Sequence, residues 1–250
     1  MVWVLHSFDD CASAARALTA LVAQDLQRSV TAAGSAMLLV SGGRSPLPLF
    51  AELAQQELPW QQIAVSLVDE RCVPRAHADS NAALVTQHLL VANASAARWV
   101  PLLDDGQAQL ATESWTLAQQ AARDANHNPL LREAAVVILG MGNDGHTASL
   151  FADAVQWPHA RNCAERYVAL QPAAAPHPRV GLSLSALIAQ GSCYVWASGA
   201  DKLATLERID GVVRAVAAGT AAPQMLEQAG PLAMLFADPK VVLHVFHSAG

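Results

Sequence analysis

Three glycines, an acid and a base follow the most apolar segment of the chain. This segment, residues 134–140, runs into the stretch VVILGMGNDGHTASLF at residues 136–151. Asp144 and His146 are two positions apart in this stretch, so in an extended backbone their side chains can face the same way. Histidine titrates near neutral pH, which suits a general base, and a neighbouring carboxylate can orient its ring or position a water molecule. The pair therefore indicates proton-transfer chemistry, such as the activation of water.

The same glycines also fit a dinucleotide-binding loop. Residues 140–145 match G-x-G-x-x-G after a predicted strand, and Glu165 stands about where a ribose-binding acid is expected. Three features count against this interpretation: Asp144 would repel a pyrophosphate, Pro158 leaves little room for a helix, and the loop lies in the middle of the chain. A plain tight turn is the other alternative, because Asp-Gly is ordinary turn chemistry.

The stretch SGGRSP follows another apolar segment. Here Gly42, Gly43, Arg44 and Ser45 precede Pro46, which suits the first turn of a helix. Free backbone N–H groups, the helix dipole and the Arg44 charge are suited to an oxyanion or a phosphate, and a simple tight turn fits equally well. The stretch is not a P-loop, because G-x-x-x-x-G-K-[ST] is missing.

Charged residues mark two further strand ends and one strand start. Asp69 and Arg71 lie in VDERCVP (68–74), where the alternative is an exposed charged loop. Lys202 follows the predicted strand 193–198 and lies in the first turn of a predicted helix. A cation is unfavourable at this end of a helix unless an anion binds nearby. A solvated surface lysine is the competing interpretation, and Arg179, at the start of another strand, says little alone.

Short apolar strands alternate with longer Ala/Leu-rich helices, and these elements must position the side chains above. Strands are predicted at 2–5, 36–41, 63–69, 134–140, 166–170, 179–184, 193–198 and 241–246. Helices are predicted after caps at Asp9 or Asp10, at Pro46 and at Asp79 or Ser80, over 117–125, and from about Asp201. This alternation predicts an α/β fold, a mostly parallel sheet with helices on both faces, in a single domain over residues 1–250. Loops after parallel strands share one edge, so the unusual loops are expected to converge.

The composition narrows the class of protein. The 250 residues are 53% hydrophobic and 14% charged with a formal net charge of −6, which indicates a globular protein. No Lys/Arg cluster is present, so we expect no nucleic-acid partner. No apolar run approaches the roughly 20 residues of a membrane span, and no signal peptide is evident, which predicts a cytoplasmic protein without a membrane partner. The four cysteines are far apart, which excludes a C-x-x-C motif. Cys72 stands beside Arg71, where a packed thiol is favoured over a reactive one.

Taken together and in order, these stretches resemble the 6-phosphogluconolactonase family of the glucosamine-6-phosphate isomerase/deaminase-like superfamily. They are SGGRSP (41–46), VDERCVP (68–74) with DSN (79–81), LGMGNDGHTASLF (139–151), PRVGLSLSAL (178–187) and SGADK (198–202). The resemblance implies a modified Rossmann-like α/β fold without a bound nucleotide, no cofactor and no metal. It also implies a carboxylic ester hydrolase that opens 6-phospho-D-glucono-1,5-lactone in the oxidative pentose phosphate pathway. The partner would be this small phosphorylated sugar lactone, and the sequence leaves open a monomer or a homodimer.

The resemblance supports His146 as general base and basic residues as phosphate contacts. We expect Asp144 to orient the imidazole or position water, with His146 kept neutral by a neighbouring helix N-terminus. Arg71 is expected to hold the developing negative charge or the substrate. The expected substrate-binding residues are Gly42, Gly43, Arg44, Ser45, Asp69, Arg179 and Lys202.

Two other functions stay open. One is a sugar-phosphate isomerase or deaminase. Those enzymes resemble one another in carrying a glutamate five residues after the shared histidine, where this chain has Phe151. The other is a non-catalytic sugar-phosphate sensor, against which the retained Asp144 and His146 argue.

Overall fold

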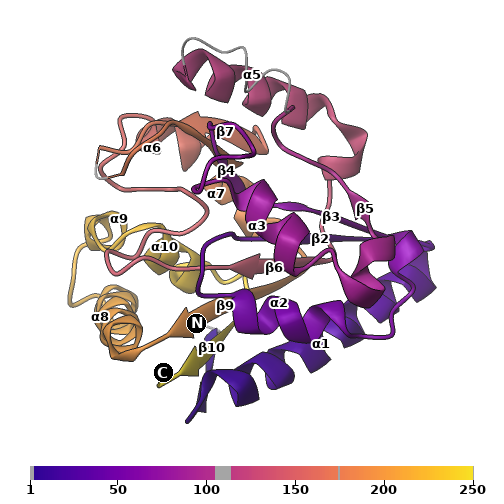
Figure 1. Ribbon diagram of the computed structural model, residues 1–250. Coiled ribbons are helices and arrows are strands. Elements are labelled where there is room, and N and C mark those ends of the chain that lie inside the picture. The colour runs from indigo at the N-terminus through magenta and orange to yellow at the C-terminus, as the bar shows by residue number, and fades with distance from the viewer. Residues whose placement is uncertain (1–2, 105–113, 174, 250) are drawn as a thin grey trace.

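The main sheet is built from parallel strands. The computed structural model describes residues 3–104, 114–173 and 175–249 (Figure 1). In spatial order the sheet contains β1 (Trp3–Phe8), β10 (Leu243–Ser248), β9 (Ser192–Ser198), β6 (Val136–Leu139), β2 (Ala36–Val40), β3 (Ile63–Leu67) and β5 (Arg98–Trp99). Every neighbouring pair in it is parallel. The central strands β2 and β6 are buried along their whole length, as their uninterrupted apolar sequences predict. These observations confirm the predicted mostly parallel α/β fold.

A second, smaller sheet stands beside the first. It contains β4 (Asp69–Arg71), β8 (Arg179–Leu182) and β7 (Tyr167–Leu170), paired antiparallel. Val68 joins the two sheets, because its N–H donates to Val40 of β2 and its carbonyl accepts from Leu182 of β8, both at 3.0 Å. The sequence correctly predicted β7 and β8 as strands but did not separate them from the parallel sheet. The residues 69–71 were expected in a strand end and loop, and they form a strand of this second sheet instead.

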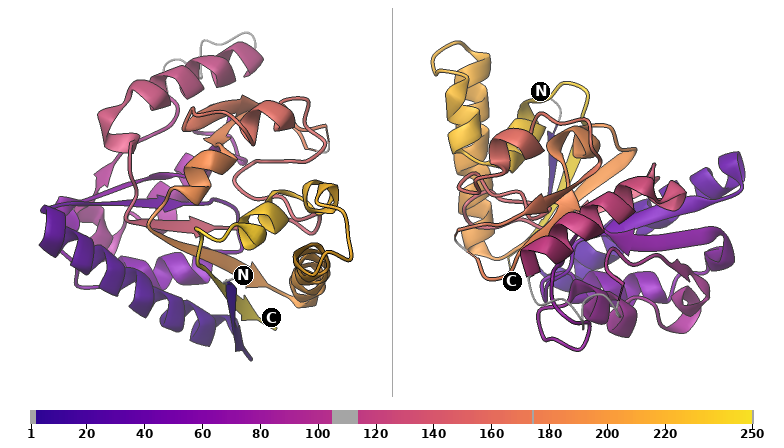
Figure 2. Two further views of the ribbon diagram at one scale, coloured as in Figure 1. Left: turned by 180° about the vertical axis from the view of Figure 1, so that it is seen from behind. Right: turned by 90° about the horizontal axis from the view of Figure 1, so that it is seen from above.

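Helices pack around the main sheet. They are α1 (Cys11–Ala33), α2 (Leu47–Ala54), α3 (Asn81–His88), α5 (Ser114–His127), α6 (Trp157–Ala160), α7 (Leu184–Ile188), α8 (Ala200–Ala217), α9 (Gln224–Gln228) and α10 (Pro231–Ala237), with 3₁₀ turns at Trp60–Gln62, Ala92–Ala96 and Pro129–Leu131. The α1 helix begins where Asp10 accepts a hydrogen bond from the Ser13 N–H and ends at Gly34 in a left-handed conformation, as predicted. Figures 1 and 2 show α5 over the small sheet, at the end of the molecule opposite α1.

The order of strands places the unusual loops side by side. Strands β9, β6, β2 and β3 are consecutive neighbours in the main sheet, and all run in the same direction. Their carboxyl ends therefore carry, from one side to the other, the loop to Lys202, the loop with Asp144 and His146, the SGGRSP loop and β4. The predicted convergence at one edge is confirmed.

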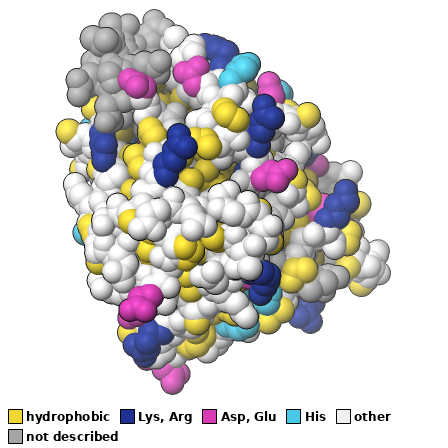
Figure 3. All heavy atoms as spheres, turned by 90° about the vertical axis from the view of Figure 1, so that its right-hand side faces the viewer, with side chains coloured by type: hydrophobic (Ala, Val, Ile, Leu, Met, Phe, Trp, Pro, Cys, Tyr) yellow, Lys and Arg dark blue, Asp and Glu magenta, His cyan; other side chains and the backbone are white. Residues whose placement is uncertain are grey.

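Two further observations concern the distribution of basic side chains on the surface and the length and polarity of the helices. On the visible, described part of the face in Figure 3, basic side chains stand singly among acidic ones and form no continuous basic patch. Across the described residues, every helix is too short or too polar to cross a lipid bilayer.

Candidate active site

A pocket of about 230 Å³ lies at the carboxyl ends of β2, β6 and β9. It is smaller than the roughly 300–1,000 Å³ pockets that hold drug-sized ligands, which suits one sugar phosphate better than a dinucleotide. The lining residues are Ser41, Gly42, Gly43, Arg44, Ser45, Pro46, Asp69, Arg71, Asn81, Ile138, Leu139, Gly140, Met141, His146, Thr147, Ala148, Ser149, Arg179, Trp196 and Lys202. Every site residue expected from the sequence is among them except Asp144, which is bonded to the lining residue His146.

Asp144 and His146 form a directed pair. Asp144 Oδ1 lies 2.6 Å from His146 Nδ1 and also accepts the backbone N–H of His146 at 3.2 Å. An ionised carboxylate can only accept, so Nδ1 of the imidazole carries the proton and Nε2 keeps its lone pair. A third of the His146 side chain is exposed, which leaves the ring open to water. The pair therefore presents Nε2 as a base.

Two neighbours hold the imidazole in place. The Phe151 ring stacks on it with centroids 4.0 Å apart and planes 25° apart. The Gly142 backbone is the second neighbour: a Cβ atom there would lie 2.1 Å from His146 Nδ1 and 2.4 Å from Asp144 Oδ1. Only glycine leaves room for the hydrogen bond, so the second glycine of the loop is required by the pair itself.

Burial sets the protonation of the pair. It lowers the pKa of His146 below its ordinary value, and the Asp144 charge opposes this without overcoming it. Burial raises the pKa of Asp144, but its interactions with His146 outweigh this and leave the pKa below its usual value. At neutral pH the acid is charged and the imidazole neutral. The next helix along the chain, α6, begins only at Trp157, so the lowered pKa of His146 is assigned to burial, its largest cause, rather than to a helix directly after the loop.

Asp69, Ser149 and Arg179 form a buried polar group on the side of the small sheet. The Ser149 hydroxyl donates to Asp69 Oδ2, and Arg179 Nη1 donates to the same hydroxyl at 3.4 Å. The Arg179 guanidinium also lies 5.2 Å from the centroid of the Phe151 ring, over its face. Ala148 and Ser149 adopt left-handed backbone conformations with φ of 53° and 57°, which are strained for residues with a Cβ atom. Sequence reasoning missed Ser149, whose motif carried no separate sign of this contact.

Arg71 is held at the rim by the segment that follows it. Its Nη1 donates to the Asp79 carbonyl at 2.8 Å. The buried Glu70 carboxylate accepts backbone N–H bonds from Arg71, Asn81 and Ala82 at 2.7, 2.9 and 2.7 Å. Glu70 thus fixes both Arg71 and the start of α3. The sequence placed this glutamate in a charged motif but could not show which amide groups it would satisfy.

The SGGRSP loop is anchored from two sides. The Trp196 indole N–H donates to the Ser45 carbonyl at 2.9 Å. A Cβ atom at Gly42 would lie 2.0 Å from Asn81 Oδ1, so this glycine permits a close approach between the loop and α3. The Arg44 side chain is exposed at the pocket. A cation and a rigid backbone loop are therefore available to an anionic ligand.

Lys202 occupies the first turn of α8. Its Nζ donates to Asn143 Oδ1 at 2.6 Å, which connects it to the loop that carries the Asp144–His146 pair. Burial lowers the pKa of Lys202, while Asp144 and Asp201 oppose the change. The cation stands near a helix N-terminus, where only a negative partner compensates for the dipole.

The chain is similar to known proteins over most of its length. The family model described as glucosamine-6-phosphate isomerases/6-phosphogluconolactonase matches residues 9–233. The chain belongs to this family. A 6-phosphogluconolactonase from Neisseria meningitidis is 37% identical over 209 residues, 83% of this chain and 88% of its own length. One from Helicobacter pylori is 30% identical over 99% of both chains. The crystal structure of a Shewanella baltica 6-phosphogluconolactonase superposes with a TM-score of 0.85 at 33% identity, covering 98% of this chain and 97% of that one.

Two further features of the structure disfavour the alternatives of a dinucleotide-binding loop and of a reactive Cys72 thiol. The glycine loop is not followed at once by a helix whose N-terminus would hold a pyrophosphate, since α6 starts at Trp157. Cys72 is buried, and burial raises its pKa to about 12, so the thiol is protonated and packed, as expected.

Proposed function

We propose that the protein hydrolyses 6-phospho-D-glucono-1,5-lactone to 6-phospho-D-gluconate, the second step of the oxidative pentose phosphate pathway. The relatives that match most of its length are 6-phosphogluconolactonases. The observation that carries the mechanism is the Asp144–His146 pair at a pocket lined by cations, with the imidazole neutral and its Nδ1 at 2.6 Å from the carboxylate. A lactone is an activated ester, so one base and one oxyanion site suffice for its hydrolysis.

The reaction divides into two steps. In the first, His146 Nε2 takes a proton from water, and the hydroxide oxygen bonds to the lactone carbonyl carbon. The carbonyl oxygen becomes an oxyanion, which Arg71 stabilises. In the second, the bond from this carbon to the ring oxygen breaks, and the imidazolium returns its proton to the departing ring oxygen. Asp144 stabilises the imidazolium between the two steps.

The sugar phosphate is bound away from the reacting carbonyl. Gly42, Gly43, Arg44 and Ser45 offer backbone N–H groups and a guanidinium, and Lys202 and Arg179 offer further cations at the same pocket. Asp69 accepts the hydrogen bond of the Ser149 hydroxyl and so fixes this side chain at the substrate-binding part of the pocket. Binding of this distant group orients the carbonyl toward water, which lowers the entropic part of the barrier.

Phe151 argues against the isomerase or deaminase activity also represented in the family's name. Ring opening and proton transfer between carbons need further acid or base groups, and the apolar Phe151 ring covers the imidazole instead. Glucosamine 6-phosphate should therefore release no ammonia with this protein.

The decisive experiment follows freshly generated 6-phosphogluconolactone with 6-phosphogluconate dehydrogenase as the coupling enzyme. We expect NADPH to appear far faster than spontaneous hydrolysis allows. A rate equal to the spontaneous one would overturn the proposal. Binding of the phosphosugar without turnover would point to a sensor, and ammonia from glucosamine 6-phosphate would point to a deaminase.

A further inference from the structure

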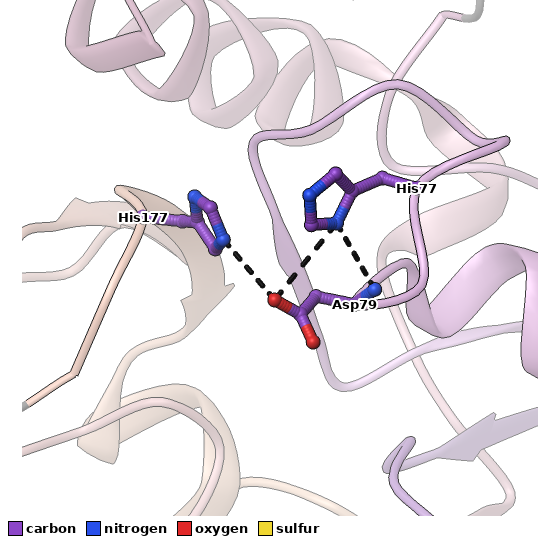
Figure 4. Close-up of side chains that lie close together, drawn as sticks. All are labelled: His77, Asp79 and His177. Atoms are coloured by element: carbon purple, nitrogen blue, oxygen red, sulfur yellow. Dashed lines mark hydrogen bonds and ion pairs between the residues drawn. The ribbon is translucent and has the colours of Figure 1, made fainter.

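Two histidines and an aspartate meet at the surface beside the small sheet, outside the pocket lining. Figure 4 shows His77 and Asp79 on the loop between β4 and α3, and His177 on the segment that leads into β8. His177 Nε2 lies 3.1 Å from Asp79 Oδ2, and His77 Nδ1 lies 3.8 Å from the same oxygen. One ligand atom from each residue lies within 4.8 Å of the other two. In the sequence, Asp79 was considered as a helix cap and as part of the DSN motif, and no role was assigned to His77 or His177.

We propose that this His77–Asp79–His177 cluster binds a divalent late first-row transition-metal ion, such as Zn²⁺, Ni²⁺ or Co²⁺. Two imidazoles and one carboxylate are a ligand set that these ions favour, whereas Mg²⁺ and Ca²⁺ take mainly oxygen ligands. Zinc–ligand bonds of about 2.0–2.1 Å place tetrahedral donor atoms about 3.4 Å apart. The observed 3.1 and 3.8 Å lie on either side of this spacing.

The two rings each place one nitrogen next to the same carboxylate oxygen of Asp79. Their centroids are 5.2 Å apart and their planes are inclined by 79°, so the rings meet edge to face and do not stack over the carboxylate. His77 Nδ1 accepts the Asp79 N–H at 3.1 Å, and a metal–nitrogen bond would replace this contact. The released N–H lies on an exposed loop where water can accept it, so the replacement costs little.

The backbone holds the ligands in place before any ion arrives. His177 has a φ of 68°, a left-handed conformation that is uncommon for a residue other than glycine. Its neighbours are fixed, because the Pro176 carbonyl accepts from Arg179 Nη2 at 3.3 Å and the Pro178 carbonyl accepts from the Cys72 N–H at 2.8 Å. On the other side, the Asp79 carbonyl is bonded to Arg71. Ligands 98 positions apart in the chain are thus brought together by the fold itself.

Exposure and charge set the expected affinity. The side chains of His77, Asp79 and His177 are 43%, 49% and 29% exposed, so an ion can enter and keep a water ligand. The charges of Arg71 and Arg179 lie close by, since Arg71 binds the Asp79 carbonyl and the Asp79 charge acts on Arg179. These cations oppose a metal ion, so we expect a dissociation constant in the micromolar range. The ion takes no part in the proposed hydrolysis.

The test must separate this cluster from a second one. His159, Cys163 and Glu165 also lie within ligand distance of one another, so the titrations use the full chain carrying His159→Ala. Isothermal titration with Zn²⁺ and Ni²⁺ should show one ion per chain. Adding His177→Asn should weaken binding at least tenfold, and asparagine is chosen because it tolerates the left-handed backbone. His77→Ala should do the same from the other loop.

Cobalt gives an independent measurement. Co²⁺ bound by two imidazoles and a carboxylate should produce visible absorption bands in the His159→Ala protein, and the bands should disappear in the His177→Asn and His77→Ala derivatives. Circular dichroism checks that each variant is folded. The proposal is overturned if the His159→Ala protein binds no ion, or if folded His177→Asn and His77→Ala derivatives retain its affinity.

Discussion

The two sheets build two walls of one pocket by different means. The parallel sheet supplies its wall from loops that follow neighbouring strands, namely SGGRSP after β2, the glycine loop after β6 and the turn to Lys202 after β9. The small sheet supplies its wall from a strand pair, in which Arg71 of β4 stands directly opposite Arg179 of β8. Each loop of the first wall is a short contiguous motif, whereas the second wall exists only once distant strands pair.

The difference has an energetic side. Like charges directly opposite each other destabilise an antiparallel pair, so the Arg71–Arg179 pairing costs folding free energy. The acidic Asp69 and the Asp79 carbonyl offset part of this cost, through Ser149 and through Arg71. A bound anion would offset more of it. The wall of loops carries the Asp144–His146 pair and most of the cations and amides proposed for the phosphate, and the wall of paired strands adds the Arg71 and Arg179 charges.

The largest expected effect comes from removing the proposed base, His146, from the wall of loops. His146→Ala should lower kcat by about 10²–10⁴-fold, because water must then attack without a proton acceptor. The coupled lactone assay, corrected for spontaneous opening, measures this. A kcat close to that of the unaltered protein would reject the role of His146.

Gly142→Ala should disrupt the geometry of the same wall while His146 itself is unchanged. The new Cβ atom would lie 2.1 Å from His146 Nδ1 and must displace the ring or the carboxylate. Misplacement of a catalytic group by about 1 Å can cost on the order of 10²-fold in rate. Gly140→Ala is the matched control, since its Cβ would meet only the Ser41 Cβ at 3.8 Å. Equal activity of the two variants would contradict the close-approach argument.

The first wall was predictable from the sequence and the second was not. Polar loops directly after β2 and β6 were visible because those strands are unbroken apolar runs, and the ends of α1 followed from Asp10 and Gly34. The positions of these loops and helix ends are determined by residue types that are close together in the sequence. The pairing of Arg71 with Arg179 depends on a register between segments more than 100 positions apart, which residue types do not reveal.

The hydrogen-bond partners of individual polar side chains could not be predicted from the sequence either. The sequence contains Glu70 and Ser149 in plain view, yet nothing in their surroundings indicates that one binds the amides of α3 and the other bridges Asp69 to Arg179. Such contacts arise from packing of the two sheets. They explain why residues that line the pocket could be named from the sequence while their hydrogen-bond partners could not.

Lys202→Ala should have a moderate effect, confined to binding. Loss of a cation proposed to contact the distant phosphate should raise KM by about tenfold and change kcat little, because such an interaction would be equal in the ground and transition states. Lys240→Ala is a matched control, since it removes the only other lysine in the chain and lies outside the pocket lining. An unchanged KM for the phosphorylated lactone in Lys202→Ala would sink the phosphate assignment.

The smallest effect concerns pH, and it isolates the contribution of Phe151. The pKa of His146 is lowered chiefly by burial, and a base works only when deprotonated. Activity, measured as kcat/KM, should therefore rise with pH through a pKa below the ordinary histidine value of about 6.5 and be flat above it.

Phe151→Ala uncovers the imidazole face, which weakens the desolvation of His146, raises its pKa and moves the rise in activity to higher pH. Phe151→Leu keeps apolar cover and should shift it less. Because Phe→Ala in a core costs about 3–5 kcal/mol, the profiles are measured well below each variant's Tm. A rise at the same pH in all three proteins would show that stacking by Phe151 does not set the protonation of the base.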